Sequence, residues 1–427
     1  MKLINLKYNI VLLLFFAGSH ISAQDNSISL KDCYNLAYKN YPEAKQTGLY
    51  QSSNELRIKN LNVNYLPQIT FKGQASYQSD VTKIVSNVPF FQPNEPPKDR
   101  YGLSVDVLQT IYDGGSTSSV KNVENAQMFI EQQKVEVNLY SLRSRINDLY
   151  FSAVLLQEKQ KVLETLRDDI KNKIKEVESK VKNEVLTSAN LYTLQAQLMQ
   201  TEQDIASVKF DKSSSVKMLA ELIGAEISTE INFNLPESDE VLFNNNYANR
   251  PEYKLFEFQK NQLSAFDDVT TSRIIPKISM FGQAGYGKPG LNLLDDSYQA
   301  FYTVGLNISW NPINWNTNAN EKQLNNIRRN IIETQKETFD KNLKVVLEKH
   351  RSDILKFEEL LEKDAELLSL REKIISSVYS QFLNGTVTST VYVTELNNKI
   401  QTELLMETHK IQLLQSKINF LTAKGDF

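Results

Sequence analysis

The sequence predicts a mixed, mainly α-helical fold, in which two tandem repeats each combine a long coiled-coil helical hairpin with two antiparallel β-strands. Three observations support this class: repeated motifs, long segments without glycine or proline, and short segments of alternating apolar and polar residues. Asn40-Tyr41-Pro42-Glu43 returns as Asn249-Arg250-Pro251-Glu252, and Leu66-Pro67-Gln68-Ile69 returns as Ile275-Pro276-Lys277-Ile278. Both returns lie 209 residues further on, so the chain is a duplicated half and not an array of units of about 20–50 residues.

The first residues have the pattern of a secretory signal peptide. Lys2 and Lys7 precede the apolar run 10–17, and the small residue Ala23 follows at a cleavage point. The run is shorter than the about 20 apolar residues that span a bilayer, so we expect export with cleavage near Ala23. The predicted segments are a signal peptide at 1–23, a first repeat at 24–224, a linker at 225–248 and a second repeat at 249–427.

Long helices are predicted where the sequence contains no glycine or proline, from Ser116 to about Lys182 and from Asn318 to about Leu383. Apolar residues recur there at steps of three and four, which places them on one face of a helix. Such a helix would measure roughly 100 Å, so we expect it to pack as coiled coil. The predicted hairpins cover about 116–222 and 318–421, with tips at 183–188 and 384–389, and shorter helices at 29–64 and 249–272 open the halves.

Four segments alternate apolar and polar residues over about ten positions, which gives a β-strand two different faces. Their length is near the 9–11 residues with which a tilted strand crosses a bilayer. Aromatic residues near their ends, including Trp310 and Trp315, fit an interfacial girdle. A soluble sheet with one wetted face shows the same alternation. The predicted strands cover about 67–78, 101–111, 276–287 and 301–311.

Transmembrane strands would require more than one chain, because four strands leave two open edges whose backbone groups would be unpaired in lipid. Closed membrane barrels need roughly eight strands or more, so a dimer with eight or a trimer with twelve would meet the requirement. In the larger barrel the polar face would line water. The residues expected to face this lumen are Thr70, Lys72, Gln74, Asn307 and Ser309.

The sequence gives no sign of an enzyme, a cofactor site or a nucleic-acid site. The net charge of −3 provides no basic field for nucleic acid, and Cys33 is the single cysteine. Gly285–Gly290 matches a dinucleotide fingerprint as a string, but Pro289 opposes the helix that must follow it. His350 and His409 are isolated on predicted helices, whereas a metal needs several converging ligands. We therefore expect no catalytic, cofactor-binding or metal-binding residues.

Several short motifs, taken in order and twice, resemble those of the TolC family of outer-membrane channel-tunnel proteins, the outer-membrane efflux proteins. They are Asn40-Tyr41-Pro42-Glu43, Leu66-Pro67-Gln68-Ile69, Tyr112-Asp113-Gly114-Gly115 and Asn384-Gly385-Thr386. The resemblance covers essentially the whole mature chain. It implies a homotrimer in which twelve transmembrane β-strands form one barrel in the outer membrane, and α-helices continue it as a tunnel through the periplasm.

The resemblance also implies an exit duct that works with a periplasmic adaptor protein and an inner-membrane transporter, in tripartite efflux or type I secretion. The duct would be passive, in contact with outer-membrane lipid, and gated at its periplasmic tips by shifts of the helices. A periplasmic coiled-coil scaffold is the alternative. The tip residues expected to form the mouth and dock the adaptor are Asn183, Thr187, Ser188, Asn384, Gly385, Thr386 and Thr388.

The second tip departs from a feature that is common in the family, acidic residues within a few turns of the tip. Val391 and Thr394 occupy this part of the helix, and Glu395 is the nearest acid. We therefore expect no ring of aspartates at the mouth, and no strong cation selectivity from such a ring. The aperture candidates are Tyr392, Thr394 and Glu395, and the comparable positions of the first hairpin are Leu191, Tyr192 and Leu194.

Overall fold

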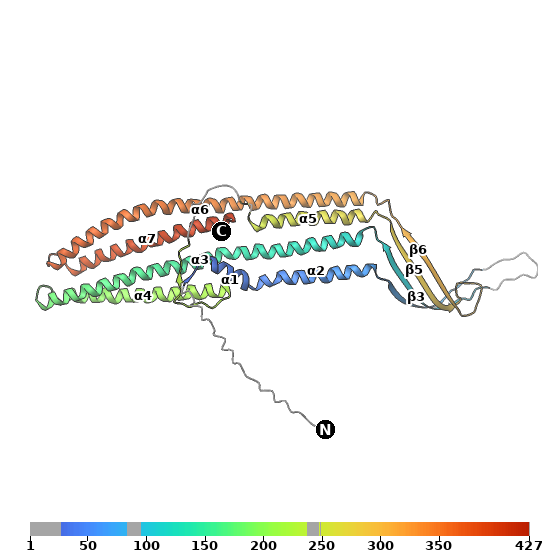
Figure 1. The fold of residues 1–427 in the computed structure, drawn as a ribbon, viewed down its shortest axis with the longest axis horizontal. Helices are drawn as coiled ribbons and strands as arrows, with labels where there is room; N and C mark the ends of the chain where they lie inside the picture. Colours follow the sequence, from blue (N-terminus) through green and yellow to red (C-terminus); the bar gives the residue numbers. More distant parts are fainter. Residues whose placement is uncertain (1–26, 83–94, 237–246, 248, 427) are drawn as a thin grey trace, which may run out of the picture.

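The computed structural model describes residues 27–82, 95–236, 247 and 249–426 of the 427-residue chain. The expected signal peptide and its cleavage near Ala23 lie outside the described residues, as do parts of the predicted linker and of the proline-rich segment between the first two strands. The described chain is elongated, with long helices along most of its length and a β-sheet at one end (Figure 1). It is mainly helical with an antiparallel sheet, as the sequence predicted.

The two hairpins have identical lengths. In the first, α3 (Ser116–Lys182) is followed by α4 (Ser188–Ile223), and in the second, α6 (Thr317–Leu383) is followed by α7 (Ser389–Lys424). The two long helices contain 67 residues each and the two return helices 36 each. Every element of the second hairpin begins and ends 201 residues after its counterpart, so residues of the two hairpins correspond one to one at that offset.

Shorter helices run beside the parts of the long helices that lead to the sheet (Figure 1). α1 (Leu30–Asn40) begins at a capping box in which Ser29 and Asp32 each accept a bond from the other's backbone. The chain breaks at Tyr41, because the following Pro42 disfavours helical backbone there, and then forms the 3₁₀ turn η1 (Pro42–Lys45). The remaining elements of this group are α2 (Gln46–Asn62), the 3₁₀ turn η2 (Val63–Tyr65) and α5 (Pro251–Ser272).

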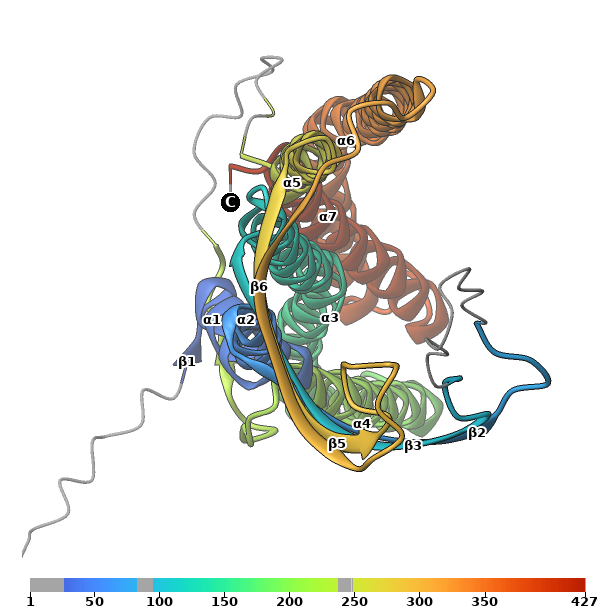
Figure 2. The same ribbon diagram turned by 90° about the vertical axis from the view of Figure 1, so that its right-hand side faces the viewer.

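The main sheet contains four antiparallel strands in the order β2-β3-β5-β6, so the two halves join through β3 and β5. β2 and β6 form its two edges, and neither has an outer partner among the described residues. The sheet curves strongly when the molecule is viewed from its end (Figure 2). The strands are β2 (Gln68–Tyr77), β3 (Asp99–Tyr112), β5 (Lys277–Lys288) and β6 (Gln299–Ser309).

A second, very small sheet joins the start of the predicted first repeat to the segment that the sequence predicted as a linker. β1 (Ser27–Ile28) pairs in parallel with β4 (Asn232–Phe233), and the buried hydroxyl of Tyr150 on α3 donates to the carbonyl oxygens of Ile28, at 3.0 Å, and Asn234, at 2.6 Å. Part of the linker is therefore bound to the core around α1, α3 and α4.

Of the helices described, none is both apolar enough and long enough to span a bilayer.

Candidate channel surfaces: sheet faces and hairpin tips

One face of the four-stranded sheet is apolar across all four strands. The register aligns Gly73 of β2 with Leu103, Tyr286 and Ala300 in one row, and Val107 of β3 with Gly282 and Val304 in another. The large side chains on this face are exposed in the single chain. Monomeric soluble proteins rarely expose a contiguous apolar surface of this extent. They are Ile69, Phe71, Tyr77, Tyr101, Leu103, Met280, Tyr286, Tyr302, Val304, Leu306 and Ile308.

The opposite face carries the polar side chains, including all five residues that the sequence assigned to a lumen. Lys72 on β2 forms an ion pair with Asp106 on β3, with 2.5 Å between the ammonium nitrogen and a carboxylate oxygen. Gln283 on β5 donates to the other oxygen of Asp106 at 2.9 Å. Thr70 pairs with Asp106 in the register, Asn307 pairs with Ser279, and Ser309 pairs with Lys277, while Gln74 lies two residues from Lys72 on the same face. The strand register brings Lys72, Asp106 and Gln283 together, and the sequence analysis did not predict this contact.

A tight turn joins each half's second strand to its long helix. Asp113 follows β3 and is buried; one carboxylate oxygen accepts from the Tyr65 hydroxyl at 2.7 Å, and the other accepts from the Thr117 backbone nitrogen at 2.6 Å. Gly114 and Gly115 both have left-handed backbone, with φ of 71° and 80°. This explains the Asp-Gly-Gly motif: the carboxylate caps α3 and the glycines allow the reversal.

In the second half, residues other than glycine occupy the same two left-handed positions. Trp315 and Asn316, the counterparts of the two glycines, have φ of 48° and 62°. Asparagine tolerates this conformation, whereas tryptophan rarely adopts it, so Trp315 is held under local strain. It is 89% exposed and lies six residues after the end of β6.

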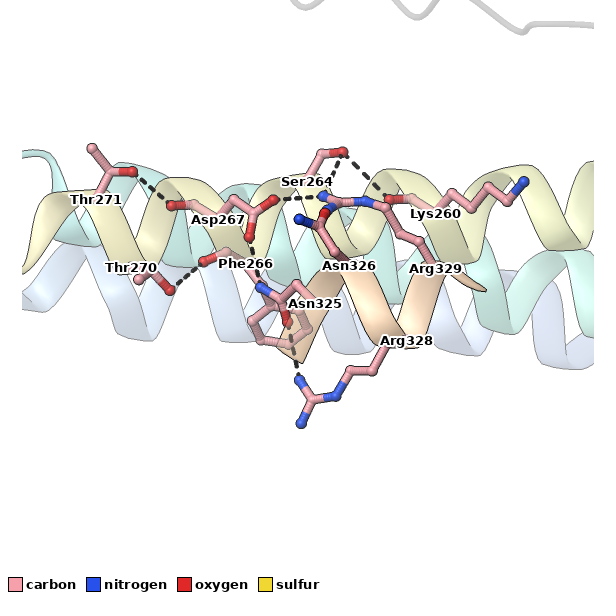
Figure 3. A network of polar contacts seen from close by, with 10 residues as sticks. All are labelled: Lys260, Ser264, Phe266, Asp267, Thr270, Thr271, Asn325, Asn326, Arg328 and Arg329. Atoms are coloured by element: carbon pink, nitrogen blue, oxygen red, sulfur yellow. Dashed lines mark hydrogen bonds and ion pairs between the residues drawn. The ribbon is translucent and has the colours of Figure 1, made fainter. Parts of the chain in front are cut away.

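The helices next to the sheet are joined by a polar network between α5 and α6 (Figure 3). The carboxylate of Asp267 accepts a hydrogen bond from Asn325 at 2.7 Å and forms an ion pair with Arg329 at 2.6 Å. Asn325 in turn accepts from Arg328 at 3.1 Å. Burial alone would raise the pKa of Asp267, but the bonds from Asn325 and Arg329 hold its pKa below the ordinary value.

The two hairpin tips have the same backbone. Glu184 and its counterpart Gly385 both take left-handed conformations, with φ of 60° and 73°. The following turn closes when the backbone nitrogens of Val185 and Thr386 donate to carbonyls at the ends of α3 and α6, at 2.9 and 3.0 Å. The backbone nitrogen of Ser389 donates to the Asn190 side chain at 3.2 Å, which connects the tips. The predicted mouth residues Asn183, Thr187, Ser188, Asn384, Gly385, Thr386 and Thr388 are all exposed.

The predicted aperture residue Tyr392 does not reach an open surface in this structure. Its side chain is 1% exposed and stacks on Phe382, with ring centroids 5.5 Å apart and planes 5° apart. Tyr379 also packs against it, with centroids 5.0 Å apart. An apolar cluster from α3, α4, α6 and α7 surrounds these rings. In this structure Tyr392 therefore holds the two hairpins together, and its role at the aperture stays a prediction.

The other two aperture candidates remain accessible. Thr394 is exposed and its hydroxyl donates to the Thr390 carbonyl oxygen at 2.8 Å. Glu395 is half-buried and forms an ion pair with Arg371 on α6, with 3.1 Å between nitrogen and oxygen. Of the first-hairpin positions, Tyr192 is exposed, Leu191 is half-buried and Leu194 is buried.

His409, which the sequence suggested was isolated, has a close partner. Its Nδ1 lies 2.6 Å from a carboxylate oxygen of the buried Asp364, which joins α7 to α6. Spacing could not reveal this contact, because 45 residues separate the two positions. Within the described part of the chain, no group of three or more histidine, cysteine, aspartate or glutamate side chains could hold a metal.

Comparisons with known proteins agree on the fold. No protein-family model and no curated protein matches the chain. The chain is similar to the structure of CusC, a protein that forms a transmembrane channel, with a TM-score of 0.66 and 13% identity over 93% of this chain and 92% of that one. It is similar to the outer membrane protein VceC from Vibrio cholerae, with a TM-score of 0.63 and 10% identity over 93% and 96%. It is also similar to the open state of the MtrE outer membrane channel of Neisseria gonorrhoeae, with a TM-score of 0.63 and 13% identity over 93% and 88%.

The matches cover nearly the whole length of this chain and of each compared structure, so they concern the complete arrangement of sheet and hairpins. At 10–14% identity they establish the fold and not the activity. The chain has the fold of these outer-membrane channels, which confirms the mainly helical fold with an antiparallel sheet that its resemblance to the TolC family implied for one chain.

Proposed function

We propose that this chain is one protomer of an outer-membrane exit duct. The observation that carries the proposal is the exposed apolar face that runs across all four strands, opposite a polar face with the Lys72–Asp106 ion pair. Lipid would cover the first face and water the second. A soluble scaffold would have to leave this apolar surface in water, at a cost of about 25 cal/mol for each square ångström.

The duct would be a homotrimer with a twelve-stranded barrel and a helical tunnel. β2 lies at one edge of the sheet, and α2 and α4 lie along the same side of the molecule, whereas β6 and α6 lie along the opposite side (Figure 1). Both strand edges and both helical sides are open. Joining the two sides of neighbouring copies head to tail closes a ring, satisfies the unpaired strand edges and covers the apolar residues along both helical sides.

The hairpin tips would form the periplasmic mouth and dock an adaptor protein that connects the duct to an inner-membrane transporter, for tripartite efflux or type I secretion. Their matching backbone would present the same polar turn twice per protomer, from residues 183–188 and 384–389. Among the aperture candidates, Thr394 and Glu395 face or approach open space. Opening would require the hairpins to shift against each other, with energy supplied by the partner.

The test compares charges placed on the two sheet faces. Val304→Lys puts an ammonium group on the apolar face, where it would cost about 2–4 kcal/mol at the middle of a bilayer. Asn307→Lys is the matched control three residues away on the polar face. We expect Val304→Lys to reduce the trimer recovered from outer membrane, and Asn307→Lys to assemble as the unsubstituted protein does.

Gly73→Lys and Thr70→Lys repeat the comparison in the first half of the chain. Equal losses on both faces would contradict the assignment of lipid and lumen. A processed protein that stays in the periplasmic supernatant as a stable monomer without detergent would overturn the proposal and favour the scaffold.

A further inference from the structure

Two phenylalanines lie on the mainly polar face of the sheet, one of them next to Leu108 of β3. In the register of β5 and β6, Phe281 stands opposite Gly305, and Phe301 stands opposite Gly285. Between these rows lies the row of Gln283 and Thr303. The alternation that assigns polar residues to one face therefore places two aromatic rings among them. Phe281 belongs to β5 and Phe301 to β6, and the polar row lies between them.

The glycines determine how these rings lie. A Cβ atom added to Gly285 would lie 2.5 Å from the ring tip of Phe301, and one added to Gly305 would lie 2.7 Å from the ring tip of Phe281. These distances are shorter than van der Waals contact, so each ring extends across the neighbouring strand and covers its glycine. Any side chain there would push the ring away from the sheet. The arrangement is the cross-strand packing of an aromatic ring on glycine, and it keeps both rings close to the wall.

Each ring covers its glycine on one side and leaves another side uncovered by the sheet. Phe281 is 37% exposed and Phe301 is half-buried, on a face that otherwise carries mostly polar side chains and glycines, with Leu108 of β3 next to Phe281 in its row. Four residues separate Gly285 and Phe281 along β5, so the two rings lie roughly 13 Å apart along the strand at about 3.4 Å per residue. Two aromatic surfaces at this spacing offer successive stacking positions along the wall.

We propose that Phe281 and Phe301 form a lumenal binding surface for aromatic solutes in transit. This rests on the proposed function, because it requires the polar face to line the channel. An aromatic solute can stack on a ring that already lies along the wall, without having to displace it, and aromatic pairs gain attraction beyond the burial of their area. In a trimer the surface would occur three times around the lumen. The polar row between the rings keeps the wall wetted.

The experiment uses the purified full-length protein in planar lipid bilayers and measures the block of its current by two cations. Tetraphenylphosphonium and tetrabutylammonium carry the same charge and have similar size, but only the first is aromatic. We expect tetraphenylphosphonium to halve the current at a roughly five-fold lower concentration, the ratio that one aromatic stacking contact supports. In the double variant Phe281→Leu/Phe301→Leu, which keeps apolar side chains but removes the rings, the ratio should fall to near one.

Tyr302→Leu is the matched control, since it removes an exposed ring from the apolar face and should keep the five-fold ratio. A double variant that retains the preference would overturn the inference, as would an unsubstituted protein that shows none. If the unsubstituted protein conducts current but both cations block it equally, the channel proposal stands and only the proposed aromatic binding surface is contradicted.

A second measurement tests the packing of the rings on glycine. Gly305→Ala should tilt Phe281 towards the lumen and lower the open-channel conductance. Gly102→Ala lies on the same face, where an added Cβ meets no atom within 4 Å, and should leave the conductance unchanged. Equal conductance for the two variants would contradict the packing that holds the rings to the wall.

Discussion

The two helical hairpins correspond residue by residue, yet the chain covers them differently. Val154 on α3 is fully buried, while its counterpart Leu355 on α6 is 53% exposed. Leu166 on α3 is buried, and its counterpart Leu367 is 42% exposed. α3 lies in the middle of the molecule with α2, α4, α5 and α7 against it, whereas the main neighbours of α6 are α5 and α7 alone. The same apolar pattern thus lies in the core of one hairpin and at the edge of the other.

This difference shows that an apolar stripe specifies that a helix is covered, but not which chain covers it. Along α3 the chain covers its own stripe. Along α6 the stripe extends to the outer side, and in the proposed trimer a neighbouring protomer covers it there. The two long helices therefore differ in where they lie in the molecule more than in their apolar pattern. Substitutions at corresponding residues can distinguish an effect on the folding of one chain from an effect on the assembly of several.

The largest effect should come from placing a charge at this corresponding pair. Val154→Lys buries an unpaired ammonium in the core of one protomer, which should cost about 4 kcal/mol or more and leave little folded protein. Leu355→Lys should leave the protomer folded but block its assembly. Circular dichroism and trimer content on native gels distinguish the two results. If Leu355→Lys trimers form in normal yield, the exposed stripe of α6 is not the contact between copies.

The second comparison is between the residues that fill the cluster at the tips. Tyr392→Ala removes a buried ring stacked on Phe382 and should lower the free energy of unfolding by about 3–5 kcal/mol. Its counterpart Leu191 is half-buried, so Leu191→Ala should cost less than about 2 kcal/mol. Thermal unfolding of both variants in detergent measures the difference. Equal losses would show that the two hairpins contribute equally to the cluster, contrary to the burial.

The elements that the sequence predicted well are those with a local signal that repeats over many residues. The strands and long helices end within a few residues of the predicted bounds, because alternation and the absence of glycine and proline are read directly along the chain. The helix predicted over 29–64 is divided at Pro42, where the break has a local cause as well. The two-residue strands β1 and β4 were missed, since each is too short to show alternation and they pair from opposite ends of the first repeat.

The site residues were harder to predict for the same reason. Alternation placed Lys72 on the polar face, but only the register between β2 and β3 brings it to Asp106. The position of Tyr392 suggested an aperture, because the helical pattern near a tip does not reveal which side another hairpin covers. Packing of the second hairpin against the first decides that it is buried. The sequence reveals which residue type occupies each position, but not which elements contact each other.

A smaller effect should come from the left-handed turn at each tip. Glu184 occupies the conformation that Gly385 occupies in the second hairpin, and a residue with a Cβ atom is disfavoured there. Glu184→Gly should therefore stabilise the first tip by about 0.5–1 kcal/mol, and Gly385→Ala should destabilise the second by about 1 kcal/mol. Opposite shifts in the midpoint of thermal unfolding would confirm the matching turns. Shifts in the same direction would contradict them.

The smallest expected effect concerns the contact between the short helix and the long helix of each half. In the second half the ion pair of Asp267 and Arg329 is half-buried, with about a quarter of each side chain exposed. In the first half the Glu124 side chain is similarly covered, but that of its partner Arg57 is 59% exposed. Asp267→Asn should cost about 1 kcal/mol at pH 7, and Glu124→Gln should cost less, because exposed pairs contribute little.

The pH dependence gives an independent check of the same contact. Since the pKa of Asp267 is lowered in the folded protein, the unfolded chain binds its proton first as the pH falls. The stability contributed by Asp267 is therefore complete above its unfolded pKa near 4 and is lost as the pH falls through the lower folded pKa. The difference in unfolding midpoint between the unsubstituted protein and Asp267→Asn should thus shrink between pH 5 and pH 3. A difference that stays constant over this range would show that the network stabilises the helices without the carboxylate charge.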